Sequence, residues 1–310
     1  MGAIGAAAAL TGCGSSNSSS MTGGSGTGGS TSYTDVDILN FALNLEYLEA
    51  EFYLHAATGS GLNSSDAGSG AGTVTGGTQV MGLTAAQQNI LNEIAYDEQE
   101  HVRFLRKALG SAAVARPAID LTNSFNALAS AAGIASTFNP FGSWDAFMVG
   151  AFIFEDVGVT AYAGAAPLIS TAGITAGYLG AAAGIMAVEA YHAGYVRTYL
   201  TAQAAANSSY PYLGYANKVS ALRATLGGGN ETALTVPTGT TTATTVVTPS
   251  AIVAASSSNA VGYARTTDQV LHIVYGSLSN TSGATTSAAG VAKGAFYPSG
   301  LNGKITVTQS

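Results

Sequence analysis

The chain has 310 residues and is poor in charge, with 9% charged and 47% hydrophobic residues. This length allows one large domain with appendages, or two domains. The formal net charge of −7 disfavours nucleic acid as a partner, because a phosphate backbone attracts basic surfaces. The single cysteine, Cys13, excludes a disulfide bond within the chain.

The N-terminal residues 1–13 read MGAIGAAAALTGC, an apolar run that ends in Cys13. This run resembles a bacterial lipoprotein signal, which implies lipidation of Cys13 and a membrane-anchored or exported protein of the bacterial cell envelope. A secretory signal normally begins with positive charge, which this run lacks, and a start codon assigned too late would explain the difference. The alternative is an alanine-rich tail with an isolated cysteine. Residues 14–33 are rich in Gly, Ser and Thr without periodicity, so we expect a disordered tether there.

Four long helices are predicted, over residues 35–58, 84–110, 143–166 and 176–207. Thr34 or Asp35 is the expected N-cap of the first helix. Thr84 and Gln87 form a capping box at the start of the second helix. Pro167 ends the third, because proline cannot continue a helix.

The connection over residues 111–143 is the longest between these helices and contains a predicted short helix near 124–132. A bundle whose second and third helices run parallel needs such a long crossover. The third helix is long and apolar enough to cross a membrane. Glu155 and Asp156 in its middle disfavour that alternative, since acids at the centre of a bilayer are expensive.

Residues 208–310 are predicted to be an extension of short helices and loops that follows a bundle of residues 34–207. Short helices are expected over 217–226 and 267–277. Residues 230–259 are rich in Thr, Val, Ser and Ala, and they predict an extended loop or short strands.

A repeated pattern of carboxylates stands out in the four long helices. Two of the chain's four histidines follow a glutamate by three residues, and two other glutamates are followed by a tyrosine seven residues later. Both spacings place the partners on one face of a helix. In chain order the pairs are Glu46–Tyr53, Glu98–His101, Glu155–Tyr162 and Glu189–His192.

The last of these pairs raises a question of charge burial. Between Val157 and Val196 the only formally charged residue is Glu189, in a segment that is apolar nearly all round. Such a helix is expected to be buried. A buried carboxylate is costly unless it is paired or bound to a metal.

The order of the four pairs answers that question. One glutamate from each of two helices, plus Glu-x-x-His from each of the other two, is the ligand pattern of a dimetal carboxylate four-helix bundle. The pattern therefore predicts an all-α fold, an up-down four-helix bundle with a long crossover between its second and third helices.

On these residues the chain resembles the ferritin-like superfamily. More narrowly, it is similar to the ferritin-like family that includes the desiccation-related proteins of plants and their fungal and bacterial relatives. The resemblance covers roughly residues 35–197, and RTTDQVLHIVYGS and GAFYPSGLNGKI near the C-terminus are similar to that family's tail. It implies a link to desiccation or oxidative stress.

We predict that six residues bind two metal ions: Glu46, Glu98 and His101 one ion, and Glu155, Glu189 and His192 the other. Glu98 and Glu189 are the expected bridging ligands. Carboxylate oxygen and imidazole nitrogen suit iron, manganese or zinc, and we expect iron or manganese, which could react with oxygen or peroxide. Four carboxylates balance the charge of two divalent ions.

Several assignments remain open from the sequence. Glu49 or Glu51 could replace Glu46 as the ligand, since Glu49 lies about 300° around the helix at ~100° per residue. Tyr53 and Tyr162 could hydrogen-bond the ligand carboxylates, serve in electron transfer, or only pack in the core.

Charged residues beside the predicted ligands have simpler expected roles. Asp97 and Glu100 are expected in solvent or in salt bridges. Arg106 and Arg197 could reach carboxylates near the site, but helix-end charge is the commoner role. No role is assigned to the remaining histidines, His55 and His272.

The leading hypothesis for function is a di-iron or di-manganese protein of the cell envelope that handles oxygen, peroxide or the metal itself, without a commitment to catalysis. The alternative is a non-catalytic structural or metal-binding envelope lipoprotein. A metal-free bundle whose buried Glu and His residues pair with one another is the corresponding alternative for the site.

Overall fold

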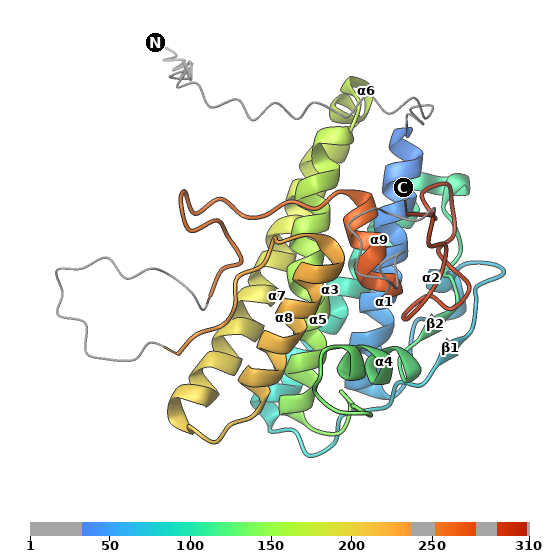
Figure 1. Ribbon diagram of the computed structural model, residues 1–310. Helices are drawn as coiled ribbons and strands as arrows, with labels where there is room; N and C mark the ends of the chain where they lie inside the picture. Colours follow the sequence, from blue (N-terminus) through green and yellow to red (C-terminus); the bar gives the residue numbers. More distant parts are fainter. Residues whose placement is uncertain (1–32, 237–251, 277–289, 309–310) are drawn as a thin grey trace, which may run out of the picture. The chain divides into compact units, whose positions relative to one another are not determined.

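In a computed structural model, the long helices pair as two antiparallel hairpins (Figure 1). The structure describes residues 33–236, 252–276 and 290–308. The first hairpin joins α1 (Asp35–Thr58) to α3 (Ala85–Leu109), and the second joins α5 (Trp144–Ala165) to α7 (Tyr178–Ala206). Contacts between distant residues fix these directions: Arg106 of α3 donates to the Tyr47 hydroxyl at 2.6 Å, whereas Gln88 near the start of α3 reaches the end of α1. The all-α bundle predicted from the carboxylate pattern is confirmed.

Shorter elements connect and cover the bundle. They are α2 (Ser64–Ala67), β1 (Val74–Thr75), a 3₁₀ turn (Gly110–Ala112), β2 (Ile119–Asp120), α4 (Asn123–Ala131), a 3₁₀ turn (Ala166–Leu168), α6 (Thr171–Thr175), α8 (Tyr212–Gly227) and α9 (Thr267–Tyr275). The two-residue strands β1 and β2 pair in parallel, with Val74 opposite Ile119. In the described parts of 230–259 only an isolated bridge between Ala255 and Gly262 is found, so the strands expected there are not seen in that part of the chain.

Local capping explains why the helix starts could be read from the sequence. The Thr34 side chain accepts from the Asp37 backbone N–H, and the Asp37 carboxylate accepts from the Thr34 backbone. Thr84 and Gln87 form the predicted capping box at α3. These bonds satisfy N–H groups that a helix start otherwise leaves without partners.

The helix α7 departs from the prediction that it is buried on nearly all sides. Glu189 and His192 point inward and are buried, but Ala183 and Ala187 are exposed and Tyr191 is 79% exposed. Small apolar residues are common on protein surfaces, so an apolar sequence does not require burial on every face. The predicted start at residue 176 was also two residues early, because Gly177 adopts φ 89° and separates α6 from α7.

The helix α5 lies in the interior of the bundle. With its 3₁₀ continuation to Leu168 it is long and apolar enough to cross a membrane, but 89% of its most apolar window is buried inside the protein. A stacked and edge-on cluster of Phe52, Phe147, Phe154 and Trp144 packs around its first half. The apolar faces of α5 are therefore covered by protein.

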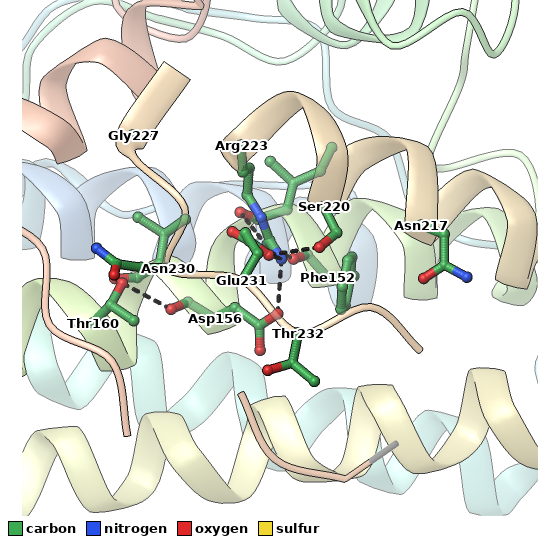
Figure 2. Close-up of polar contacts among 12 residues, drawn as sticks. Phe152, Asp156, Thr160, Asn217, Ser220, Arg223, Gly227, Asn230, Glu231 and Thr232 are labelled. Carbon is green, nitrogen blue, oxygen red and sulfur yellow. Dashed lines mark hydrogen bonds and ion pairs between the residues drawn. The ribbon is translucent and has the colours of Figure 1, made fainter. Parts of the chain in front are cut away.

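A buried ion-pair network ties the C-terminal extension to α5. Asp156 accepts hydrogen bonds from Arg197 of α7 at 2.8 Å and from Arg223 of α8 at 2.7 Å. Glu231 accepts from Arg223 at 2.8 Å and from Arg265 at 2.6 Å. Figure 2 shows Asp156, Arg223 and Glu231 converging between α5 and α8. The expectation of a helix-end role for Arg197 is wrong, because its side chain is fully buried against Asp156.

We predict that Asp156→Asn lowers the free energy of unfolding by about 3 to 5 kcal/mol, because it leaves two buried guanidinium groups beside a neutral amide. Urea denaturation followed by circular dichroism measures the change. Glu100→Gln is the control, since Glu100 forms a partly exposed ion pair with Arg103 at 2.6 Å, and it should cost less than about 1 kcal/mol. Equal losses in the two variants would contradict a stabilising role for the buried network.

Candidate metal centre

Six residues from the four long helices bring their side chains together in the middle of the bundle, and each of these residues is at most 8% exposed. They form two overlapping groups, within each of which one potential ligand atom per residue lies within 4.8 Å of the others. The first group is Glu46, Glu98, His101 and Glu189, and the second is Glu98, Glu155, Glu189 and His192. All six predicted ligands are brought together, and Glu98 and Glu189 belong to both groups, where bridging ligands are expected.

Each histidine turns its Nδ1 toward the carboxylates. Nδ1 of His101 lies 3.2 Å from Glu46 Oε2 and 3.4 Å from the nearest oxygens of Glu98 and Glu189. Nδ1 of His192 lies 3.0 Å from Glu98 Oε1 and 3.5 Å from Glu155 Oε2. The i, i+3 spacing of Glu and His on α3 and on α7 places both side chains of each pair on the inward face.

The two predicted tyrosines hydrogen-bond Glu46 and Glu155, the glutamates that each belong to one group only, and each tyrosine bonds the glutamate of the other helix. The Tyr53 hydroxyl of α1 donates to Glu155 Oε1 of α5, and the Tyr162 hydroxyl of α5 donates to Glu46 Oε1 of α1. Both tyrosines are also buried, so they pack in the core as well as hydrogen-bonding. Because each tyrosine engages Oε1, the other oxygen of each glutamate is left to face a histidine.

The carboxylates in the centre lack hydrogen-bond donors. Both oxygens of Glu98 and both oxygens of Glu189 are buried and accept no hydrogen bond from any described residue. Buried charged groups without partners are strongly unfavourable. Two divalent cations would supply the missing partners, so the donor set fits a pair of metal ions.

Burial and the close approach of like and opposite charges shift the pKa values of the glutamates and histidines in the cluster. Burial, followed by repulsion from Glu98, raises the pKa of Glu189 well above its ordinary value. Burial also favours the neutral form of Glu98, but the imidazole rings of His101 and His192, 3.4 and 3.0 Å from its oxygens, outweigh burial when they are charged and lower the pKa of Glu98 to about 2. Although burial alone would lower them, attraction to Glu46 and Glu155 raises the pKa values of His101 and His192 respectively.

Of the alternative ligands on α1, Glu51 points away from the centre and Glu49 lies beside it. Glu51 pairs with Arg116 and lies 3.3 Å from His55. The Glu49 carboxyl is buried, its Oε2 accepts no hydrogen bond, and burial followed by repulsion from Glu189 raises its pKa well above the usual range. Glu49 belongs to neither group of candidate ligands, which favours Glu46 as the ligand.

Gly158 of α5 makes room for these acids. A Cβ atom at this position would lie 2.6 Å from Glu189 Oε2 and 3.5 Å from Glu49 Oε1. A larger residue would therefore displace a carboxylate of the centre.

One residue in contact with the site was not assigned to it from the sequence. This residue is Asp97, whose Oδ2 lies 3.2 Å from His192 Nε2. Asp97 was expected in solvent or a salt bridge, and its ionic partner is a residue of the centre on another helix.

A pocket of about 420 Å³ between α3 and α7 leads from the surface to Asp97 and His192. It is lined by Asp97 and His192 together with Ile90, Glu93, Ile94, Val188, Tyr191 and Tyr195. The opening gives small solutes a route to the His192 side of the centre.

Comparisons with known proteins agree with this fold. The family profile of the ferritin-like domain matches residues 34–202. The chain is 30% identical over 285 residues to the ferritin-like catalase Nec2 of Nesocodon mauritianus, covering 87% of this chain and 84% of that protein. It is 30% identical over 205 residues to the desiccation-related protein PCC13-62 of Craterostigma plantagineum, covering 63% of each. No solved structure gives a significant match.

A helical bundle with a buried carboxylate and histidine cluster defines the class of protein. The chain belongs to the ferritin-like domain family.

We predict that the metal-free protein loses stability as the pH rises above 4.5, the ordinary pKa of a glutamate. The folded pKa of Glu189 is raised, so the folded state keeps a proton that the unfolded state releases, and stability falls until the folded pKa is passed. Urea denaturation of chelator-treated protein across pH 4.5 to 8 measures the slope. Glu189→Gln should flatten it, whereas a slope unchanged by this substitution would contradict the assignment.

Proposed function

We propose that this protein is a dimetal carboxylate enzyme that holds two iron or manganese ions and breaks down hydrogen peroxide. The observation that carries the proposal is the pair of overlapping four-residue groups that share Glu98 and Glu189. Similarity over most of the chain to a protein named as a ferritin-like catalase supports peroxide as the substrate.

The ligand atoms follow from the geometry. His101 and His192 would bind through Nδ1, Glu46 and Glu155 through Oε2, and Glu98 and Glu189 would bridge. Iron or manganese ions held there would supply electrons that reduce one peroxide to two waters, and would recover them from a second peroxide released as dioxygen.

The chain itself positions and protects this chemistry. By donating to their second oxygens, Tyr53 and Tyr162 fix the two glutamates that each belong to one group only. Burial, followed by repulsion from Glu189, raises the pKa of Glu49 and so favours the neutral form of its carboxyl group beside the centre. The pocket between α3 and α7 admits a molecule as small as peroxide, while the helices shield the opposite side of the cluster from water.

The test is metal analysis of protein purified from its native host without added metal, followed by measurement of oxygen evolution from peroxide. We expect about two iron or manganese ions per chain, and we expect Glu98→Ala plus Glu189→Ala to lose both ions and the activity while remaining helical. Glu100→Ala is the control, since Glu100 is on α3 outside the two groups and outside the pocket lining, and this variant should retain both ions and the activity.

Retention of two ions by the Glu98 and Glu189 double variant would overturn the ligand assignment. Bound zinc, or no stoichiometric metal after anaerobic reconstitution with iron and manganese, would favour the alternative function, a non-catalytic structural or metal-binding protein.

We also propose that the protein is a lipoprotein of the bacterial cell envelope, anchored through Cys13. The support is the apolar run of residues 1–13, followed by a Gly/Ser-rich tether to residue 33. Cys13 and nearly all of the tether lie outside the described residues.

If this is right, Cys13→Ala will shift the full-length protein from the membrane fraction to a soluble fraction of bacterial cells and abolish its labelling by a radioactive fatty acid. Immunoblotting of the fractions detects the change. Unchanged fractionation of the variant together with no labelling of the wild type would contradict the anchor.

A further inference from the structure

We propose that the two halves of the centre bind metal unequally, and that the half containing His192 fills first because Asp97 holds that histidine in place. This inference rests on the metal site of the proposed function, but not on its activity toward peroxide.

The His192 ring is fixed from both sides. Its Nδ1 lies 3.0 Å from Glu98 in the centre, and its Nε2 lies 3.2 Å from Asp97 Oδ2 on the pocket side. The side chain of His192 is 7% exposed and that of Asp97 is 29% exposed, so the pair lies where the pocket meets the centre. A carboxylate that accepts the proton of one ring nitrogen leaves the other nitrogen free to bind metal and makes it more basic.

His101 lacks such a carboxylate. Its Nδ1 faces the centre in the same way, 3.2 Å from Glu46. Across residues 33–236, 252–276 and 290–308, no acid is found within ion-pair distance of its Nε2.

The internal repeat explains the difference. Glu189 and His192 follow Glu98 and His101 by 91 residues each, and at the same offset the counterpart of Asp97 is Val188. Val188 has no polar atom in its side chain. It therefore cannot accept a hydrogen bond from His101 as Asp97 does from His192.

The candidate ligands and the tyrosines of the two halves are matched. The Tyr53 hydroxyl donates to Glu155 and the Tyr162 hydroxyl donates to Glu46, and both groups include Glu98 and Glu189. Glu49 also breaks the repeat, since its counterpart at the offset of Glu46 and Glu155 is Gly158. Among the neighbouring acids, Glu189, which both groups share, repels the Glu49 carboxylate most strongly, whereas Asp97 contacts one histidine directly. Asp97 is therefore the positioning residue that distinguishes the halves.

The experiment is calorimetric titration of the metal-free full chain with Mn²⁺ and with Zn²⁺. Loss of a carboxylate partner from a metal-bound histidine typically weakens affinity by about 10- to 100-fold. We expect two unequal binding steps in the wild type, and Asp97→Asn should weaken the tighter step by that factor. Val188→Asp should strengthen the weaker step. In the Asp97→Asn, Val188→Asp double variant, the half containing His101 should bind metal more tightly than the half containing His192.

Nuclear magnetic resonance of ¹⁵N-labelled histidine rings assigns the steps to residues. One equivalent of Zn²⁺ should shift the His192 signals before those of His101 in the wild type, and the order should reverse in the Asp97→Asn, Val188→Asp double variant. Circular dichroism confirms that each variant is folded.

The outcomes separate this inference from the proposed function. Two equal steps, or an Asp97→Asn variant with unchanged affinities, would overturn the inequality while leaving the metal site intact. Unequal loading with His192 filled first, but without oxygen evolution, would support the inequality and overturn only the peroxide activity. No binding of either metal by the wild type would overturn both.

Discussion

The burial of four glutamates at the centre of one bundle is the constraint on which the rest of this structure depends. Glu98 and Glu189 have no hydrogen-bond donors among the described residues, and like charges at this distance repel strongly where water is excluded. Histidine nitrogens and tyrosine hydroxyls offset part of that cost. The uncompensated part of that cost is the reason why the donor set fits metal ions: cations would be the partners that the carboxylates lack.

A buried network of ion pairs lies directly behind this centre. Asp156 follows Glu155 in sequence, and on the helix it faces away from the cluster toward two buried arginines, Arg197 and Arg223. Arg223 and Arg265 come from the region after the four long helices, so the extension completes the burial of α5. A second contact does the same at α1, where the Tyr297 hydroxyl donates to the Asn44 carbonyl at 2.7 Å. The extension is therefore part of the scaffold that holds the ligands.

The two helical hairpins repeat the same pattern of residues, and the positions at which they differ are informative. Ligands and tyrosines are kept in both halves, whereas Asp97 and Glu49 have Val188 and Gly158 as counterparts. Acidic residues in place of Val188 and Gly158 would add two more carboxylates beside the four glutamates of the cluster, which Glu49 and Asp97 already flank. The centre is thus symmetrical in its ligand atoms and asymmetrical in the groups around them.

The residue pattern alone predicts the four long helices and the six residues of the candidate site. Helix starts such as Thr34 and Thr84 are set by bonds within four residues, and the i, i+3 spacing fixes which side chains share a face. The contacts between helices emerge only in the folded structure: Tyr53 reaches Glu155 instead of its own neighbour Glu46, Asp97 contacts His192, and Arg197 is buried against Asp156. Each of these contacts joins different helices, so it depends on the packing of whole elements, which local spacing does not encode. For the same reason an apolar sequence did not reveal that one face of α7 is exposed.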